Sequence, residues 1–172
     1  KTATKMIENT RIGVIGLGYV GLPLACLFAR LYKVKGFDCN EQKVKRLLTA
    51  KDDTCEVDDN TLKTLLSSGM HLTAKAEDLQ DCNVYIVCVP TPVDADNNPD
   101  LTPLIEASKT VGSLLKKGDI VIYESSVYPG CTENDCIPVL AAESKLEYNK
   151  DFFAGYSPER INPGDKQHTV EN

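Results

Sequence analysis

The sequence of 172 residues lacks any apolar run that approaches the ~20 residues needed for a membrane-spanning helix. Its first ten residues, Lys1 to Thr10, are polar and lack the apolar core of a signal peptide. It also lacks an excess of positive charge, because 19 Lys and Arg against 25 Asp and Glu give a net charge of -6. Such a protein repels nucleic acid and acidic membranes. We therefore expect a soluble cytoplasmic protein with no nucleic-acid or membrane partner.

Metal-binding and disulfide motifs are missing as well. The two histidines, His71 and His168, are isolated and have no HxxxH or cysteine companion. The seven cysteines are odd in number and scattered, and none belongs to a CxxC pair. This pattern is typical of reduced cytosolic thiols, so we expect neither a disulfide framework nor a metal site.

The composition that remains is that of an ordinary globular protein, with 42% hydrophobic and 26% charged residues in a length that suits one core. Short β-rich runs alternate with longer runs of helical period, which is the pattern of βαβ units. We predict an α/β fold of Rossmann type, with a doubly wound, mainly parallel sheet in three layers. The predicted strands are Arg11–Ile15, Val34–Asp38, His71–Thr73, Val84–Val89, Ile120–Tyr123 and Phe152–Gly155. The predicted helices are Tyr19–Tyr32, a helix capped by Asn40 that runs through Leu48, a short one at Leu62–Leu66, Leu104–Leu115 and Thr132–Ala142.

A glycine motif, GLGYVG at residues 16–21, follows the first predicted strand and opens the first predicted helix. Only in this context is GxGxxG a dinucleotide-binding fingerprint. Gly16 permits the tight turn, Gly18 lets the backbone approach a pyrophosphate, and Gly21 permits close packing of the helix. Tyr19 and Val20 complete the turn at the helix N-terminus, where N–H groups favour a bound phosphate.

An acid at the end of the second strand selects the dinucleotide. Asp38 lies 38 - 16 = 22 residues beyond the first glycine, where a carboxylate can accept hydrogen bonds from the ribose hydroxyls of an adenosine. A 2′-phosphate would meet this carboxylate, so we predict NAD rather than NADP as the cofactor. Lys43, one turn into the next helix, adds a positive group near the same ribose edge. The alternative is a glycine-rich turn that binds nothing.

Three later strand ends carry unusual polar residues, and ligands of such sheets bind outside the carboxyl ends of the strands. Thr91 stands between two prolines after the fourth strand, Ser126 follows the fifth, and Glu159 follows the sixth. Each segment alone is typical of a turn, but together they predict one crevice in which Glu159 acts as a base or orders a water. Cys131 precedes a predicted helix without a neighbouring base, so we interpret it as a structural thiol.

The segments IGVIGLGYVGLPLA, VPTP, ESSVYPGCTE and YSPERINPGDK together resemble the UDP-glucose/GDP-mannose dehydrogenase family, over residues 11 to 168. PDLTPL at Pro99–Leu104 and the YSPERINPGDK segment are similar to the branch that oxidises UDP-N-acetylhexosamines, especially UDP-N-acetylgalactosamine, for bacterial surface polysaccharides. The resemblance implies two NAD-dependent oxidations at C6 of the sugar, through a cysteine-bound thioester. It also implies three segments: a polar tail at 1–10, an NAD-binding domain at 11–162, and a polar segment at 163–172 that leads toward a central helix and a substrate domain.

The resemblance also assigns roles to residues. Gly16 to Gly21, Asp38 and Lys43 would hold the adenosine diphosphate half of NAD, with Thr91 near its middle. Ser126 would contact the cofactor and position the catalytic water, as a threonine does in many members. Glu159 would assist thioester hydrolysis and, with Arg160 and Ile161, contact the substrate.

Two departures from the family pattern qualify these roles. Where UDP-glucose dehydrogenases carry a second Glu, four residues after the first, this sequence has Pro163, which argues against UDP-glucose. The glycine-rich motif with the nucleophilic Cys is absent, as are the catalytic Lys and Asn, so we expect the chain to bind NAD but not to turn over alone. The longer enzyme would form a homodimer or larger oligomer. The alternatives are a UDP-ManNAc, UDP-glucose or GDP-mannose dehydrogenase, or a regulatory NAD-binding module.

Overall fold

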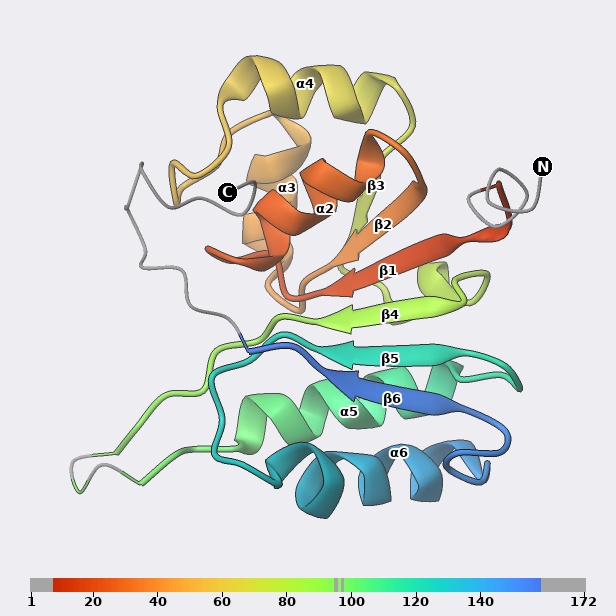
Figure 1. The fold of residues 1–172 in the computed structure, drawn as a ribbon. Helices are drawn as coiled ribbons and strands as arrows, with labels where there is room; N and C mark the ends of the chain where they lie inside the picture. The colour runs from red at the N-terminus through yellow and green to blue at the C-terminus, as the bar shows by residue number, and fades with distance from the viewer. Residues whose placement is uncertain (1–7, 95, 97, 159–172) are drawn as a thin grey trace.

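A computed structural model describes residues 8–94, 96 and 98–158 of the chain. Its centre is one parallel sheet of six strands, in the order β3-β2-β1-β4-β5-β6 (Figure 1). The strands are β1 (Arg11–Ile15), β2 (Lys33–Phe37), β3 (His71–Thr73), β4 (Val84–Val87), β5 (Ile120–Tyr123) and β6 (Phe153–Tyr156). The α/β fold with a doubly wound parallel sheet is therefore confirmed.

Helices cover both faces of the sheet, which gives the three layers (Figure 1). One face of the sheet, over β1, β2 and β3, is covered by α2 (Gly21–Ala29), α3 (Glu41–Leu48) and α4 (Asp59–Ser67). On the opposite face, α5 (Thr102–Leu114) and α6 (Ile137–Ser144) pack on β4, β5 and β6. No helix among the described residues is both long and apolar enough to cross a membrane.

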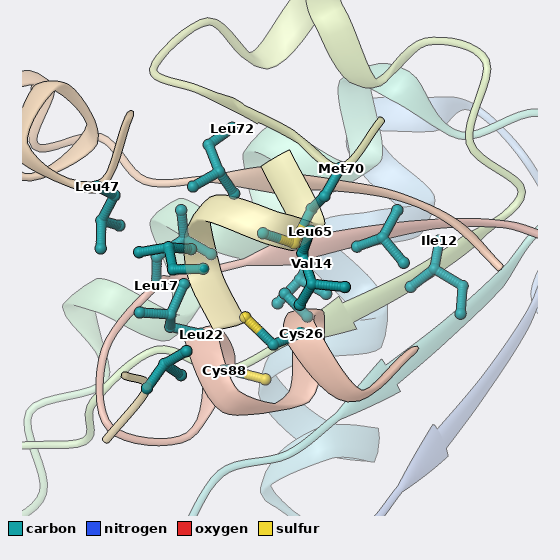
Figure 2. Packing of buried hydrophobic residues seen from close by; sticks show 14 of the residues in the cluster. Ile12, Val14, Leu17, Leu22, Cys26, Leu47, Leu65, Met70, Leu72 and Cys88 are labelled. Atoms are coloured by element: carbon teal, nitrogen blue, oxygen red, sulfur yellow. The ribbon is translucent and has the colours of Figure 1, made fainter. Parts of the chain in front are cut away.

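Two apolar clusters hold the layers together, one on each face of the sheet. The first joins β1 and β2 to α2, α3 and α4 through residues such as Val14, Leu22 and Leu47 (Figure 2). The second joins β4 and β5 to α5 and α6, and its Tyr123 hydroxyl lies 2.7 Å from the Ser108 hydroxyl of α5. Burying these side chains supplies the main driving force for folding.

The sheet has a switch point at its centre. After β3, at one edge of the sheet, the chain returns to β4 on the other side of β1, and β1 pairs in parallel with both β2 and β4. The loops after β1 and β4 therefore leave the sheet in opposite directions, and the crevice between them is where such sheets bind ligands.

Several predicted boundaries differ from those observed. The helix predicted at Thr132–Ala142 is a π-helical turn, η2 (Thr132–Cys136), followed by α6. Pro138, in the first turn of α6, has no N–H to donate to the preceding turn, so the chain widens there. The helix predicted at Tyr19–Tyr32 is α2, which is shorter at both ends, and β4 ends two residues earlier than predicted. A short 3₁₀ helix, η1 (Ala76–Leu79), was not predicted.

Candidate functional site

A cavity of about 880 Å³ lies at the switch point of the sheet. The ends of β1, β2, β4 and β5, and one face of α5, contribute its walls. Every predicted cofactor-contacting position that the structure describes lies among its lining residues, except Gly21, which is buried behind the turn: Gly16, Gly18, Tyr19, Val20, Asp38, Lys43, Thr91 and Ser126. The size of the cavity is in the usual range for a site that takes a cofactor.

The glycine turn forms the floor of this cavity. Gly16 has a φ of +95°, and a Cβ there would lie 2.6 Å from the Cys88 carbonyl oxygen, so no other residue fits without strain. A Cβ on Gly21 would lie 1.7 Å from the Gly16 carbonyl oxygen. A Cβ on Gly18, in contrast, would meet nothing within 4 Å. Gly16 and Gly21 are thus required by the fold, whereas Gly18 keeps an open space.

The N-terminus of α2 lies at the same cavity, since its N-cap residue, Val20, lines the cavity together with Gly18. Val20 offers no side-chain acceptor, and the first turn contains no acidic residue. The first N–H groups of a helix carry a partial positive charge, which favours an anion at this end. The turn can therefore hold a pyrophosphate with backbone donors, in a protein whose net charge is negative.

Asp38 is buried, with 7% of its surface exposed, and its carboxylate links three segments of the site. Oδ2 accepts hydrogen bonds from Leu17 N at 3.0 Å and from Lys43 Nζ at 2.8 Å. Oδ1 accepts one from Asn40 N at 2.9 Å. The carboxylate thus fixes the glycine turn to the end of β2, and it keeps acceptor capacity on Oδ1 for a ribose hydroxyl. Lys43, predicted as a positive group near the ribose, is paired with Asp38 here.

The opposite wall comes from the ends of β4 and β5. The Oγ1 atom of Thr91 is buried and has no hydrogen-bond partner within the part of the chain that the structure describes. A buried hydroxyl without a partner is unfavourable, and a ligand group in the cavity would satisfy it. Ser125 donates a hydrogen bond to the Val89 carbonyl at 3.3 Å, which joins the two strand ends, and Ser126 lines the cavity beside it.

Three predicted site residues, Glu159, Arg160 and Ile161, lie outside the described residues. Of the predicted crevice, the structure therefore places only Thr91 and Ser126, and both line the cavity.

Cys131 is fully buried, and burial raises the pKa of its thiol. This burial agrees with the interpretation of Cys131 as a structural thiol. Among residues 8–94, 96 and 98–158, no group of three or more His, Cys, Asp or Glu is placed to hold a metal ion.

Comparison with known proteins agrees with this geometry. Residues 10–172 match the model of the NAD binding domain of the UDP-glucose/GDP-mannose dehydrogenase family. This chain belongs to the UDP-glucose/GDP-mannose dehydrogenase family. A UDP-N-acetyl-D-glucosamine 6-dehydrogenase of Pseudomonas aeruginosa is 55% identical over 96% of the chain, and one of Salmonella typhi is 49% identical over 96%. The chain spans 39% of the length of each of these two relatives.

A solved structure has the same fold. It is a UDP-D-ManNAc dehydrogenase from Pyrococcus horikoshii, with a TM-score of 0.83 and 40% identity over 90% of this chain and 37% of that one. The cofactor of this family domain is NAD, and the residues present suit it. The open space at Gly18, the buried acid at Asp38 and the unsatisfied hydroxyl of Thr91 each match a part of a dinucleotide.

Sequence reasoning missed a part of this NAD site. The face of α5 that lines the cavity carries Pro103, Glu106, Ala107 and Thr110. Thr54, from the loop between α3 and α4, lines it as well. The helical period predicts that α5 buries one face, but not which residues of that face meet the cavity rather than the sheet. Thr54 lies in a polar stretch without periodicity, so no sequence signal pointed to it.

Proposed function

We propose that this chain is the NAD-binding part of an NAD-dependent UDP-sugar 6-dehydrogenase that oxidises a UDP-N-acetylhexosamine to the uronate. The observation that carries the proposal is the cavity at the switch point, with a buried Asp38 at its ribose end, in a chain 55% identical to a UDP-N-acetyl-D-glucosamine 6-dehydrogenase. Bound NAD supplies the hydride acceptor for oxidation at C6 of the sugar.

The residues of the chain hold and orient this cofactor. The turn from Gly16 to Gly21 and the N-terminus of α2 bind the pyrophosphate, and Asp38 accepts from the adenosine ribose. Thr91 Oγ1 forms a hydrogen bond with the middle part of the cofactor. This bond satisfies a buried hydroxyl that has no partner among the described residues.

The chemical steps need groups near the reacting carbon. We assign to Ser126, on the β5 side of the cavity, the positioning of the hydrolytic water. The family resemblance of the YSPERINPGDK segment supports Glu159 as the group that assists hydrolysis of the thioester. The same resemblance supports Arg160 and Ile161 as substrate contacts. The nucleophilic cysteine and the substrate domain belong, in this proposal, to sequence beyond the 172 residues.

The epimer at C4 of the sugar separates two leading substrates. The similarity to the UDP-N-acetyl-D-glucosamine 6-dehydrogenases of Pseudomonas aeruginosa and Salmonella typhi favours UDP-N-acetylglucosamine. The resemblance at Pro99–Leu104 favours UDP-N-acetylgalactosamine. In this proposal the sugar binds outside the cofactor cavity, so the cavity does not distinguish the two epimers. Both UDP-sugars are therefore tested. The second candidate function is a regulatory NAD-binding module, which the intact cofactor cavity also suits.

The test compares the chain with the longer gene product, with NADH formation from each UDP-N-acetylhexosamine followed at 340 nm. We expect no NADH from the chain of 172 residues and sustained turnover by the longer protein. In that protein, Glu159→Gln should accumulate substrate on the downstream cysteine, because an amide cannot accept a proton from the attacking water. Mass spectrometry detects the adduct, and Glu159→Asp is the matched control that keeps the carboxylate. Turnover of Glu159→Gln at the parental rate without an adduct would refute its role, and a gene that ends at Asn172 would favour the regulatory module.

A further inference from the structure

The loop between α3 and α4 forms a wall of the cofactor cavity that neither the fingerprint nor the family motifs assign. Its residue Thr54 lines the cavity, and the loop contains two non-glycine residues with positive φ, Ala50 at 58° and Cys55 at 57°. Such backbone conformations persist only where other interactions fix them. The loop is therefore held in a defined shape beside the cofactor.

Asp52 is the residue that holds this shape. Its carboxylate accepts hydrogen bonds from the backbone N–H groups of Thr54 at 2.9 Å, Glu56 at 3.0 Å and Val57 at 3.0 Å. Val57 is buried in the apolar cluster that joins α2, α3 and α4 to the sheet, which anchors the far end of the loop. One side chain thus organises the loop around itself, and the loop cannot move without breaking several of these bonds.

The Thr54 hydroxyl also contacts Asp52. Its Oγ1 lies 2.7 Å from Oδ1 and 2.8 Å from Oδ2 of Asp52, so it donates its single proton to the carboxylate. A threonine hydroxyl has one proton and two lone pairs. With the proton committed to Asp52, Thr54 can offer a ligand only an acceptor.

The position of the loop indicates which half of NAD it meets. Thr54 lines the cavity together with Asp38, Asn40 and Lys43, which lie at the end of β2 and the start of α3. Val57, whose N–H binds Asp52, belongs to the same apolar cluster as Cys26 of α2 and Val34 of β2, which places the loop on the β2 side of the sheet. Thr91 and Ser126 belong to the other side of the cavity, at the ends of β4 and β5.

We propose that Thr54 is a cofactor-binding residue that accepts a hydrogen bond from a donor on the adenosine half of NAD, and that Asp52 is its positioning residue. The donor is a ribose hydroxyl or the adenine amino group. If the donor is a ribose hydroxyl, this acceptor, backed by a carboxylate, also opposes a 2′-phosphate and adds to the selection that Asp38 exerts against NADP.

The test uses Thr54→Val, which replaces the hydroxyl by a methyl group, and Thr54→Ser, which keeps the hydroxyl, in calorimetric titrations with NAD and ADP-ribose. We expect Thr54→Val to weaken both ligands by the same factor, about three- to tenfold, and Thr54→Ser to stay within about twofold of the parent. The melting temperature should fall only modestly, because Asp52 loses the hydroxyl donor but keeps the backbone bonds from Thr54, Glu56 and Val57. Should Thr54→Val not fold, Thr54→Ala serves in its place.

Two further arms identify the donor and test the role of Asp52. Deamino-NAD lacks the adenine amino group. If the donor is a ribose hydroxyl, Thr54→Val should bind deamino-NAD more weakly than the parent does, and if the donor is the amino group, the two proteins should bind it equally. Asp52→Asn should weaken NAD binding in the parent but add no further loss in the Thr54→Val background, since it acts through Thr54. Parental NAD affinity in Thr54→Val, or an equal loss in Thr54→Ser, would overturn the assignment of Thr54. A fully additive Asp52→Asn effect would overturn the positioning role.

Discussion

Replacing Asp38 by alanine should change both the affinity and the specificity of the cofactor site. The carboxylate is buried and accepts from Leu17 N, Asn40 N and Lys43 Nζ at 2.8 to 3.0 Å. Alanine removes the acceptor for the ribose hydroxyls, so NAD affinity should fall by about 1–3 kcal/mol, which is about five- to 140-fold. Leu17 N also loses its partner in a buried place, so the melting temperature should fall as well.

The same substitution releases the ammonium of Lys43, which pairs with Asp38 in the parent. Free of the carboxylate, Lys43 can approach a 2′-phosphate, so NADP affinity should rise while NAD affinity falls. Titration of Asp38→Ala with both dinucleotides checks the change in their ratio. The double variant with Lys43→Met is the control, and it should lose the gain in NADP affinity. If Asp38→Ala kept the parental preference for NAD, the carboxylate would not set the specificity, and the reasoning would be wrong.

Further substitutions test the remaining walls of the cavity. Gly18→Ala should leave the melting temperature unchanged but weaken NAD binding, since its Cβ occupies the pyrophosphate space. Gly21→Ala should unfold or strongly destabilise the chain, since its Cβ would lie 1.7 Å from a backbone oxygen. Thr91→Val should weaken NAD binding without lowering the melting temperature, because it removes a buried hydroxyl that has no partner in the described chain. Iodoacetamide at pH 8 should modify only the exposed thiols, Cys39 and Cys55. Bound NAD should slow the reaction of Cys39, which lines the cavity. Mass spectrometry of the labelled peptides checks both points.

The last of these predictions rests on a clear division among the cysteines. Five thiols are buried, and burial raises the pKa of Cys26 and Cys136 to about 12 and that of Cys82 to about 11. The thiolate is the reacting species, so these groups stay protonated and unreactive at pH 8. Labelling of a buried cysteine in the folded chain at the rate of Cys55 would contradict this division.

The succession of strands along the chain and the glycine turn could be predicted from the sequence because both rest on local patterns. The run at Arg11–Ile15 is apolar and short, GLGYVG follows it directly, and Asn40 caps α3 with its side chain on Lys43 N, as the spacing indicated. The π-helical turn at Thr132–Cys136 could not be predicted, since Pro138 permits several ways to lose a helical hydrogen bond.

The cavity was predictable only where its walls follow strand ends. Asp38 directly follows β2, and Thr91 and Ser126 follow the ends of β4 and β5 within four residues, so the rule that ligands bind outside the carboxyl ends of the strands placed them together. Thr54 depends instead on hydrogen bonds that Asp52 makes across a loop, and these bonds exist only once the chain has folded. The pairing of Lys43 with Asp38 was likewise not evident, because the sequence shows that two charges are near each other but not that one neutralises the other.

Calorimetric titration of the unmodified chain with NAD and NADP tests most directly whether the cavity at the switch point is an NAD site with a specificity set by Asp38. The geometry predicts saturable binding of NAD at one site, at least about tenfold tighter than NADP, because a 2′-phosphate would approach a buried carboxylate. The absence of saturable NAD binding, or an NADP affinity equal to or greater than that for NAD, would contradict it.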